Sequence, residues 1–427
     1  MKRLLLVLCV LAPLHARCAE AGFKPLFDGT SLEGWFGWGT EDPRKLLAMA
    51  PGDLEALMDK SLADIRQHWK AEGGELVNDG KGLYLSTRRF YGDFELRLEY
   101  STVAGADSGV YLRGCPQVQI WDPNQKGNPE ARLGSGGLWN NSPGAPGKDP
   151  LRRMDKPFGQ WNSLRVVMVG EIVSVWFNGE GVVKNARMEN YFDRKTPLPA
   201  RGPIQLQTHG GVIRWRNLQV REIAPDEATR LLREADPDDA AFKTLFNGRD
   251  LAGWQGAAGG YEVKPGGILA CKRGSGGTLL TTEEYADFVL RFEFRLPPAG
   301  NNGIAVRAPL QGDPAWNGFE IQVLDDTAPA YANLKPYQFH GSVYGLVPAH
   351  RGYLRPVGEW NYQEIRFQGS KVRVCVNGTV TVDTDLATVD TAGRDRIPQG
   401  LQRPQGFLGL AGHNDPVEFR RIEVRRL

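Results

Sequence analysis

The sequence lacks the features that mark several large classes of protein. Its 427 residues include only five cysteines and six histidines, and the formal net charge is only +2. A charge this small provides no basic surface for nucleic acid or for an anionic membrane. After the N-terminal segment, no apolar run is long enough to cross a membrane. A disulfide scaffold, a nucleic-acid-binding protein and a multi-span membrane protein are therefore excluded.

The motifs of the common catalytic centres are also missing. There is no Gly-x-Ser-x-Gly, phosphate-binding loop, dinucleotide fingerprint, His-Glu-x-x-His or EF-hand loop. The histidines are scattered along the chain, which argues against a His-rich metal site. We expect no cofactor, although the residues leave open a divalent cation held by carboxylates near Asp122 or Asp325.

The N-terminal segment has the pattern of a cleaved signal peptide. Two basic residues precede the apolar run Leu4–Leu14, and Ala19-Glu20-Ala21 supplies the small-x-small cleavage pattern. A lipid anchor on Cys18 is disfavoured, because Arg17 stands where a lipoprotein needs a small residue. We therefore expect residues 1–21 to be removed and the protein to be secreted or periplasmic, with no transmembrane anchor.

The chain contains the same set of sequence blocks twice. Six blocks recur in the same order, and each copy spans about 200 residues. The two clearest pairs are Phe23–Trp35 with Phe242–Trp254, and Tyr91–Tyr100 with Tyr285–Phe294. Blocks that recur once over such a length indicate a tandem duplication of a whole domain rather than a solenoid. We expect domains at residues 22–223 and 242–427, joined by a charged linker at 224–241.

The first copy carries about 25 extra residues between its first two blocks. Apolar residues recur there at three- and four-residue steps, which predicts a helix with Asp53 as its N-cap. We expect a helical insertion near residues 41–70 that packs on the first domain, and a functional lid is the alternative. The apolar residues are Leu54, Leu57, Met58, Leu62, Ile65 and Trp69.

Outside this insertion the chain has the pattern of short strands. The 52 glycines and 28 prolines follow no collagen-like period, and this density of turn formers favours strands over long helices. Apolar and charged residues alternate in segments 94–100 and 288–294, and Asn178-Gly179 and Asn377-Gly378 stand where two-residue hairpin turns belong. The predicted fold class is all-β, with two tandem antiparallel β-sandwiches and a helical insertion in the first.

The alternation also gathers polar and aromatic side chains on the face of each domain that points away from its core. A solvated sheet face usually carries Lys, Glu and Thr, whereas this face carries residue types that stack on sugar rings and bond to hydroxyls. We interpret it as a carbohydrate-binding surface, and support for long loops is the alternative. Its members are Tyr111, Arg113, Gln117, Gln119, Trp121, Gln205, Gln207 and His209 in the first copy, and Arg307, Glu320, Gln322 and His413 in the second.

Two further aromatic residues occupy matching positions in the copies. Trp139 ends the segment Gly-Gly-Leu-Trp, and Tyr344 ends the segment Gly-Ser-Val-Tyr. Both residues are candidates for a wall beside the polar face, and packing in the core is an equally good interpretation.

Together the ordered motifs resemble those of the 3-keto-disaccharide hydrolase domain family. They include Leu-Phe-Asp-Gly, Tyr-x-Asp-Phe-x-Leu, Asn-x-Gly-Ile-x-x-Arg, Glu-x-Gln-x-x-Asp, Trp-Asn and Val-Asn-Gly, and the set covers both copies. The resemblance implies a concanavalin A-like jelly roll with a sugar-binding concave face. It also implies an enzyme that cleaves carbohydrate substrates already oxidised to a ketone at C3.

Such a reaction needs few catalytic groups. A ketone at C3 acidifies the hydrogen on C2, so a base can form an enolate that expels the C1 substituent, and water then adds. A general base contributes about 10²–10⁴-fold, and donors to the enolate oxygen contribute about 10²–10³-fold. We expect Arg307 or Arg113 to be such a donor.

The copies differ at the positions that the resemblance makes catalytic. The Glu-x-Gln of the family is Glu320-Ile-Gln322 in the second copy but Gln117-Val-Gln119 in the first, and the preceding strand begins with Asn301 and Asp107 respectively. We expect the second copy to be active, with Glu320 as the base. The candidate catalytic residues are Glu320, His413, His340, Asp107 and His209. The candidate substrate-binding residues are Arg307, Gln322, Tyr344, Tyr111, Arg113, Gln119, Trp121 and Trp139.

A tandem pair of non-catalytic, lectin-like binding modules is the main alternative to an enzyme. A sugar groove with a single carboxylate fits either function, so the sequence alone does not separate them. A measurement of turnover of a 3-keto-glycoside separates the two functions.

Overall fold

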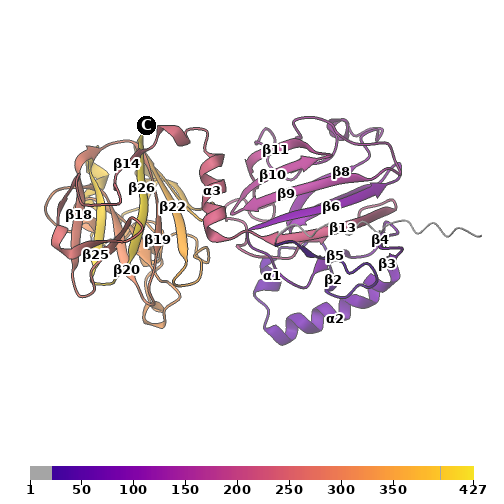
Figure 1. Ribbon diagram of the computed structural model, residues 1–427, viewed down its shortest axis with the longest axis horizontal. Coiled ribbons are helices and arrows are strands. Elements are labelled where there is room, and N and C mark those ends of the chain that lie inside the picture. Colours follow the sequence, from indigo (N-terminus) through magenta and orange to yellow (C-terminus); the bar gives the residue numbers. More distant parts are fainter. Residues whose placement is uncertain (1–21, 395) are drawn as a thin grey trace, which may run out of the picture.

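The computed structural model describes residues 22–394 and 396–427. The expected signal peptide lies outside the described residues. Figure 1 shows two β domains side by side, with helix α3 (Pro225–Ala235) between them. In the described part of the chain, no helix has the length and apolar character needed to cross a membrane.

The first domain is a sandwich of two antiparallel sheets. The larger sheet has the strand order β11-β10-β9-β6-β13-β4-β3, with β1 beside β13, and the smaller sheet has the order β2-β5-β12-β7-β8. The strands of the larger sheet are β1 (Lys24–Pro25), β3 (Trp69–Glu72), β4 (Glu75–Asn78), β6 (Phe94–Thr102), β9 (Asn162–Val169), β10 (Ile172–Phe177), β11 (Glu180–Arg187) and β13 (Ile213–Glu222). Those of the smaller sheet are β2 (Trp35–Trp38), β5 (Tyr84–Thr87), β7 (Asp107–Leu112), β8 (Cys115–Trp121) and β12 (Gln205–Leu206).

The second domain repeats this topology strand for strand. Its larger sheet has the order β16-β17-β26-β19-β22-β23-β24, with β14 beside β26, and its smaller sheet has the order β15-β18-β25-β20-β21. The larger sheet consists of β14 (Lys243–Thr244), β16 (Tyr261–Lys264), β17 (Ile268–Cys271), β19 (Phe288–Arg295), β22 (Trp360–Gln368), β23 (Lys371–Val376), β24 (Thr379–Asp385) and β26 (Glu418–Arg426). The smaller sheet consists of β15 (Trp254–Gly256), β18 (Gly276–Tyr285), β20 (Asn301–Ala308), β21 (Phe319–Leu324) and β25 (Gly406–His413). The all-β fold class with two tandem β-sandwiches is confirmed.

The core of each domain lies between its two sheets. Alternate residues of β6 and β19 point into these cores, as the period of two predicts. Full burial of each large apolar side chain contributes about 1.5–3 kcal/mol, so this pattern fixes which face of each strand is inside. The residues are Phe94, Leu96, Leu98 and Tyr100 in the first core, and Phe288, Leu290, Phe292 and Phe294 in the second.

Two tight hairpins join matching strands in the larger sheets. Asn178 and Asn377 have positive φ angles of 51° and 50°, and each is followed by a glycine whose φ is also positive. Two successive positive φ angles are the signature of a type I′ turn, in which asparagine followed by glycine is favoured. The turns connect β10 to β11 and β23 to β24, where the sequence predicts them.

The insertion in the first domain is helical. It contains α1 (Arg44–Leu47) and α2 (Pro51–His68). Ala50 is the N-cap of α2, so Asp53 lies within the first turn rather than at the cap. Proline is favoured at the first helical position because its fixed φ suits the helix and its missing N–H would have no partner there.

This insertion covers part of the outward face of the smaller sheet. Leu46 and Met58 of the helices pack on Phe36 and Trp38 of β2. Figure 1 shows α2 lying along the smaller sheet beside β2. The second domain has no counterpart of α2 in its described residues, and its one α-helix is the short α4 (Pro314–Asn317).

The linker helix α3 contacts both domains. Arg221 of the first domain pairs with Glu227 of α3 at 2.7 Å, and Arg233 of α3 pairs with Glu423 of the second domain at 2.8 Å. Ala228 joins an apolar cluster with residues of β9 in the first domain. The helix therefore ties the two domains together.

The domains also contact each other directly. The buried carboxylate of Glu171 accepts hydrogen bonds from the N–H of Leu198 at 3.1 Å and from the N–H of Val380 in the second domain at 3.2 Å. The N–H of Glu171 donates to the carbonyl of Gly378 at 3.1 Å. The hydroxyl of Tyr353 donates to the carbonyl of Leu198 at 3.0 Å. These bonds cross the boundary and fix the relative position of the copies.

The sequence leaves open whether Cys271 and Cys375 are bonded to each other. In the structure both are free thiols, as is Cys115. Burial raises the pKa of the Cys115 thiol to about 12, so this residue is a small apolar group rather than a nucleophile.

Candidate functional site

The smaller sheet of the second domain holds a buried carboxylate on its outward face. Glu320 of β21 pairs with Ala305 of β20, and its side chain crosses over Gly303. The Glu320 side chain is only 5% exposed, and its Oε1 has no hydrogen-bond partner. A Cβ atom at Gly303 would lie 1.9 Å from this oxygen, so glycine leaves the room that the carboxylate needs. Buried polar atoms usually have a hydrogen-bond partner, so the unpaired Oε1 makes Glu320 a candidate functional residue.

His413, at the end of β25, stands beside this carboxylate. Its Nε2 lies 3.7 Å from Oε1 of Glu320, close enough for an ion pair but too far for a hydrogen bond. Burial raises the pKa of Glu320, and the neighbouring Glu320 carboxylate raises the pKa of His413. The His413 side chain is 49% exposed, so the pair connects a buried carboxylate with solvent.

The loop between β20 and β21 supplies a rim for this pair. Trp316 contacts Tyr344 edge to face, with the ring centroids 6.0 Å apart. The N–H of Tyr344 donates to the backbone carbonyl of Glu320 at 2.8 Å, which joins the segment of Tyr344 to β21. The negative charge of Asp313 adds to the rise in the pKa of both Glu320 and His413. The β20–β21 loop therefore adds negative charge near the pair.

Both copies hold this face with the same hydrogen bond. The amide of Gln322 donates to Oδ1 of Asn301 at 2.8 Å, and the amide of Gln119 donates to Oδ1 of Asp107 at 2.8 Å. In the first copy, Oδ2 of Asp107 also contacts Nδ1 of His209 at 2.7 Å. Each copy thus has a histidine–carboxylate pair on this face, with the carboxylate on β21 in the second copy and on β7 in the first.

The pair of the first copy is far more open to solvent. The side chain of His209 is 61% exposed and that of Asp107 is 28% exposed. Both oxygens of the Asp107 carboxylate have partners, whereas Oε1 of Glu320 has none. Of the two pairs in the described residues, only that of the second copy has a buried carboxylate oxygen without a hydrogen-bond partner.

The outward face of the first copy is filled by its own side chains. Tyr111, Gln205 and Gln207 occupy the positions that are alanine or glycine in the second copy, namely Ala305, Gly409 and Ala411. The hydroxyl of Tyr111 lies 3.1 Å from the hydroxyl of Thr40, which precedes the helical insertion. Larger side chains and the insertion therefore close this face.

Trp121 and Trp139 contact each other at the edge of the first copy. Their rings meet edge to face with the centroids 4.8 Å apart. The ammonium group of Lys148 lies 3.7 Å from the centroid of the Trp139 ring. One face of Trp139 is therefore covered by a cation–π contact, and Tyr344 is the matching residue in the second copy.

The structure differs from the expectation for Arg113 and Arg307. Both residues have positive φ angles, 54° and 49°, at points where the strand pairing shifts register. This local irregularity turns the side chains towards the end of the sandwich. Arg113 donates to Asp93 at 2.9 Å, and Arg307 donates to the carbonyl of Gly369 at 2.6 Å. Both guanidinium groups thus donate to loops at the end of the sandwich, away from the histidine–carboxylate pairs, and their role as donors to an enolate oxygen stays a prediction.

His340 lies in the core rather than at the site. Its ring stacks on Phe294 with the centroids 5.0 Å apart, and its Nδ1 accepts the N–H of Leu324 at 3.2 Å. Burial lowers the pKa of His340 to about 3, so the imidazole is neutral at physiological pH. The structure thus places His340 in the core, apart from Glu320 and His413, and its role as a proton carrier stays a prediction.

The carboxylates considered for a divalent cation are bound to backbone groups. Asp122 accepts the N–H of Gly105 at 3.0 Å, and Asp325 accepts the N–H of Ala299 at 2.8 Å. In residues 22–394 and 396–427, no group of three or more His, Cys, Asp and Glu side chains could hold a metal ion. Both carboxylates therefore serve as loop-stabilising acceptors.

Asp313 and Trp316 are not among the residues that the sequence predicts for the site. They belong to a segment between β20 and β21 that has no counterpart in the first copy, since the offset between the copies rises from 194 at Gly303 to 203 at Glu320. That change in offset was the available signal, because it marks an extra loop directly before the predicted base.

The chain thus consists of two β-sandwiches, each with a histidine–carboxylate pair at the edge of its smaller sheet. Residues 22–221 and 241–425 match the family described as the 3-keto-alpha-glucoside-1,2-lyase-like domain. The chain belongs to this family and contains its domain twice.

Known proteins similar to the chain match a length of about one copy. A 3-keto-disaccharide hydrolase from Bacteroides thetaiotaomicron is 25% identical over 233 residues, which are 45% of this chain and 80% of that protein. A crystal structure from Parabacteroides distasonis, named as a glycosyl hydrolase, is 27% identical, with a TM-score of 0.39, and the match covers 44% of this chain and 99% of that one. A carbohydrate-binding module from Bacillus subtilis is 13% identical, with a TM-score of 0.28, and the match covers 40% of this chain and 95% of that one.

The substitution Gly303→Ala tests the geometry of the second-copy pair. The added Cβ would displace the Glu320 carboxylate, so the pKa of His413 should fall towards the ordinary value of a histidine. An NMR titration of the histidine ring protons measures this change. The matched variant Gly109→Ala, whose Cβ would meet Gln117 at 2.6 Å, should leave His413 unchanged. An unchanged His413 titration in Gly303→Ala would contradict the pairing.

Proposed function

We propose that the protein cleaves the glycosidic bond of 3-keto-glycosides or 3-keto-disaccharides, and that the second copy performs the reaction. The observation that carries this proposal is the buried Glu320 carboxylate, whose free Oε1 stands 3.7 Å from His413. A carboxylate with a raised pKa is a stronger base, once ionised, than an exposed one. Membership of the family and the similarity to a 3-keto-disaccharide hydrolase support the substrate class.

The proposed reaction begins with a proton transfer from C2. The ketone at C3 acidifies this hydrogen, Glu320 takes the proton, and the electron pair of the C2–H bond moves into the carbonyl group as an enolate. The enolate then re-forms the ketone and expels the C1 substituent. The C1–O bond breaks, a double bond forms between C1 and C2, and protonated His413 gives its proton to the departing oxygen.

Hydration of the double bond completes the cycle. Water supplies a hydroxyl group to C1 and its remaining proton to His413, while Glu320 returns its proton to C2. The net reaction is hydrolysis, and both side chains recover their starting states. A positioned general base contributes about 10²–10⁴-fold to such a reaction.

The first copy is assigned a non-catalytic role in this proposal. Its Asp107 is more exposed than Glu320 and has partners on both oxygens. Its outward face is filled by the buried side chains of Tyr111, Gln205 and Gln207. These properties suit a structural or binding domain better than a domain that abstracts a proton.

The substrate class is tested with a matched pair of glycosides. The protein lacking residues 1–21 is incubated with a 3-keto-glucoside and with its unoxidised parent, and release of the leaving group is followed. The parent lacks the acidified hydrogen, so it should react slower by orders of magnitude. Efficient hydrolysis of the parent would refute the mechanism, and binding without turnover of either sugar would favour the lectin-like alternative.

The role of Glu320 is tested by Glu320→Gln, with Asp107→Asn as the matched control. The amide keeps the shape of the side chain but has no proton-accepting oxygen comparable to a carboxylate. We expect kcat on the 3-keto substrate to fall by about 10²-fold or more with little change in affinity, whereas the control keeps nearly full activity. A melting curve for each variant reports its folding. Full activity of a folded Glu320→Gln protein would remove Glu320 from the mechanism, and loss confined to Asp107→Asn would move the active site to the first copy.

The pH dependence of the reaction is tested through His413. The base must be ionised, and burial raises the pKa of Glu320 above 4.5, so kcat/KM should rise with pH through that raised value. The contact with His413 opposes this rise in the pKa of Glu320. Replacing His413 by asparagine should therefore move the acidic limb of the kcat/KM profile to higher pH, and His209→Asn should not. A limb that stays in place or moves to lower pH would show that His413 does not act on the base.

A further inference from the structure

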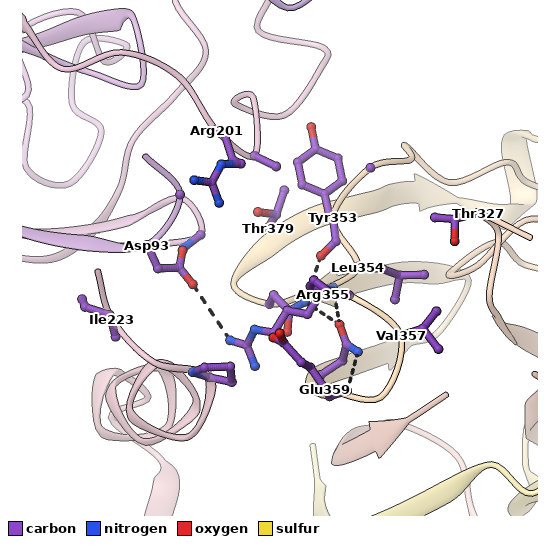
Figure 2. Close-up of a pocket in the computed structure, with 18 of the residues that line it drawn as sticks. Asp93, Arg201, Ile223, Thr327, Tyr353, Leu354, Arg355, Val357, Glu359 and Thr379 are labelled. Atoms are coloured by element: carbon purple, nitrogen blue, oxygen red, sulfur yellow. Dashed lines mark hydrogen bonds and ion pairs between the residues drawn. The ribbon is translucent and has the colours of Figure 1, made fainter. Parts of the chain in front are cut away.

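A cavity of about 540 Å³ lies between the two domains. One side comes from the first copy, around Asp93, Arg201 and Glu222, and the other comes from residues 352–357 and Glu359 of the second copy. Figure 2 shows these groups facing one another across the boundary. The volume falls within the range of about 300–1,000 Å³ that is usual for small-molecule sites. Its lining includes no member of either histidine–carboxylate pair.

Arg355 is the central polar residue of this cavity. Its side chain is 11% exposed, and its Nη1 donates to the carbonyl of Trp360 at 2.7 Å. Its Nη2 is buried and has no hydrogen-bond partner. Leaving a buried charged donor unsatisfied is costly, so a ligand atom that accepts from Nη2 would be stabilised.

Asp93 faces Arg355 across a gap. Oδ1 of Asp93 accepts from Arg113 at 2.9 Å and from the N–H of Gly170 at 2.9 Å, which holds the carboxylate in place. Oδ2 of Asp93 lies 3.9 Å from Nη2 of Arg355, the contact drawn between them in Figure 2. This distance is too long for a hydrogen bond. A hydroxyl group near both atoms can accept from the guanidinium group and donate to the carboxylate.

The charges around the cavity disfavour an ionic ligand. Three arginines in its lining, Arg113, Arg201 and Arg355, are accompanied by carboxylates that include Asp93, Glu222 and Glu359. The carboxylates would repel an anion, and the guanidinium groups would repel a cation. A neutral ligand with several hydroxyl groups is repelled by neither. Its hydroxyls can accept hydrogen bonds from the guanidinium groups and donate hydrogen bonds to the carboxylates.

The same loop of the second copy adds apolar surface. Tyr353, Leu354 and Val357 line the cavity, and Val357 is 40% exposed. Because the Tyr353 hydroxyl is bonded to the carbonyl of Leu198, this residue is held in place across the boundary. Fixed apolar side chains beside paired hydrogen-bonding groups match the two kinds of surface on a sugar ring, its C–H face and its hydroxyls.

We propose that the cavity between the domains binds a neutral mono- or disaccharide, with Arg355 and Asp93 sharing one of its hydroxyls and the 353–357 loop packing on its ring. This second site is separate from the histidine–carboxylate pairs and does not depend on the proposed reaction. It requires both copies, because one copy supplies Asp93 and the other supplies Arg355.

The first copy contains a natural control for this proposal. Lys156 occupies the position of Arg355, and its Nζ donates to the carbonyl of Trp161 at 2.9 Å, just as Nη1 of Arg355 donates to that of Trp360. The backbone N–H of each residue also donates to an asparagine, at 3.0 Å for Lys156 and 2.8 Å for Arg355. A lysine at this position therefore keeps a donor to the loop carbonyl, whereas Arg355→Lys replaces the guanidinium group by a single ammonium and removes the Nη2 donor that faces Asp93.

The test measures saccharide binding by the full mature chain. Glucose, methyl α-glucoside, maltose, trehalose, sucrose and cellobiose are titrated into the wild type and into Arg355→Lys by calorimetry and by NMR. Lys156→Arg is included as the control because it makes the reciprocal change outside the cavity. We expect at least one saccharide to bind and its affinity to fall about tenfold or more in Arg355→Lys only.

Each outcome of this test bears on the proposal. No binding of any of these saccharides at tens of millimolar would show that the gap holds only solvent, and it would overturn the proposal. Equal affinity in the wild type and Arg355→Lys would also overturn it, because the saccharide would then bind elsewhere. Turnover of the 3-keto-glucoside is measured in parallel, so a failure of the proposed reaction remains distinguishable from a failure of this site.

Discussion

The hydrogen bond that joins the two adjacent strands of each outward face constrains the rest of the site. Gln119 donates to Asp107 and Gln322 donates to Asn301, at 2.8 Å in both copies. The acceptor at the strand head can be a carboxylate or an amide, because either presents an oxygen in the same place. Two carboxylates on so small and buried a face would repel each other and raise each other's pKa. The second copy therefore combines a neutral Asn301 with an ionisable Glu320. In the first copy the positions are reversed, with an ionisable Asp107 and a neutral Gln117.

The difference between the copies lies in side-chain volume more than in backbone topology, since their strand orders are the same. The second copy has alanine or glycine where the first has Tyr111, Gln205 and Gln207. Each copy also adds its extra segment at a different point. The insertion of the first copy covers its own face, whereas the β20–β21 loop of the second brings Trp316 to the rim. The two copies thus share one topology, but the outward face of the first copy is covered, whereas that of the second copy holds the Glu320–His413 pair.

Much of the fold was predictable because it depends on local patterns that repeat. Alternation in segments 94–100 and 288–294 identified core-facing residues, and the asparagine–glycine pairs identified two hairpins. The positions of Arg307 and His340 were not predictable in this way. A single positive φ angle redirects Arg307, and a loop that folds back between the sheets buries His340 against Phe294. Strand alternation carries no information about a bulge or about the path of a loop.

The contact between the domains explains why matching loops of the copies diverge in sequence while keeping the same hydrogen bonds. In each copy an asparagine at the hairpin donates to the loop carbonyl, at 2.7 Å to Met154 and at 2.8 Å to Tyr353. The backbone of the loop is therefore set by bonds that do not depend on its side chains. In the second copy, Tyr353 and Arg355 face the other domain, and the hydroxyl of Tyr353 reaches the carbonyl of Leu198. Because the backbone of the loop is fixed, its side chains can change without disturbing the sandwich. The loop of the second copy can therefore carry residues that contact the first domain and line the cavity between the domains.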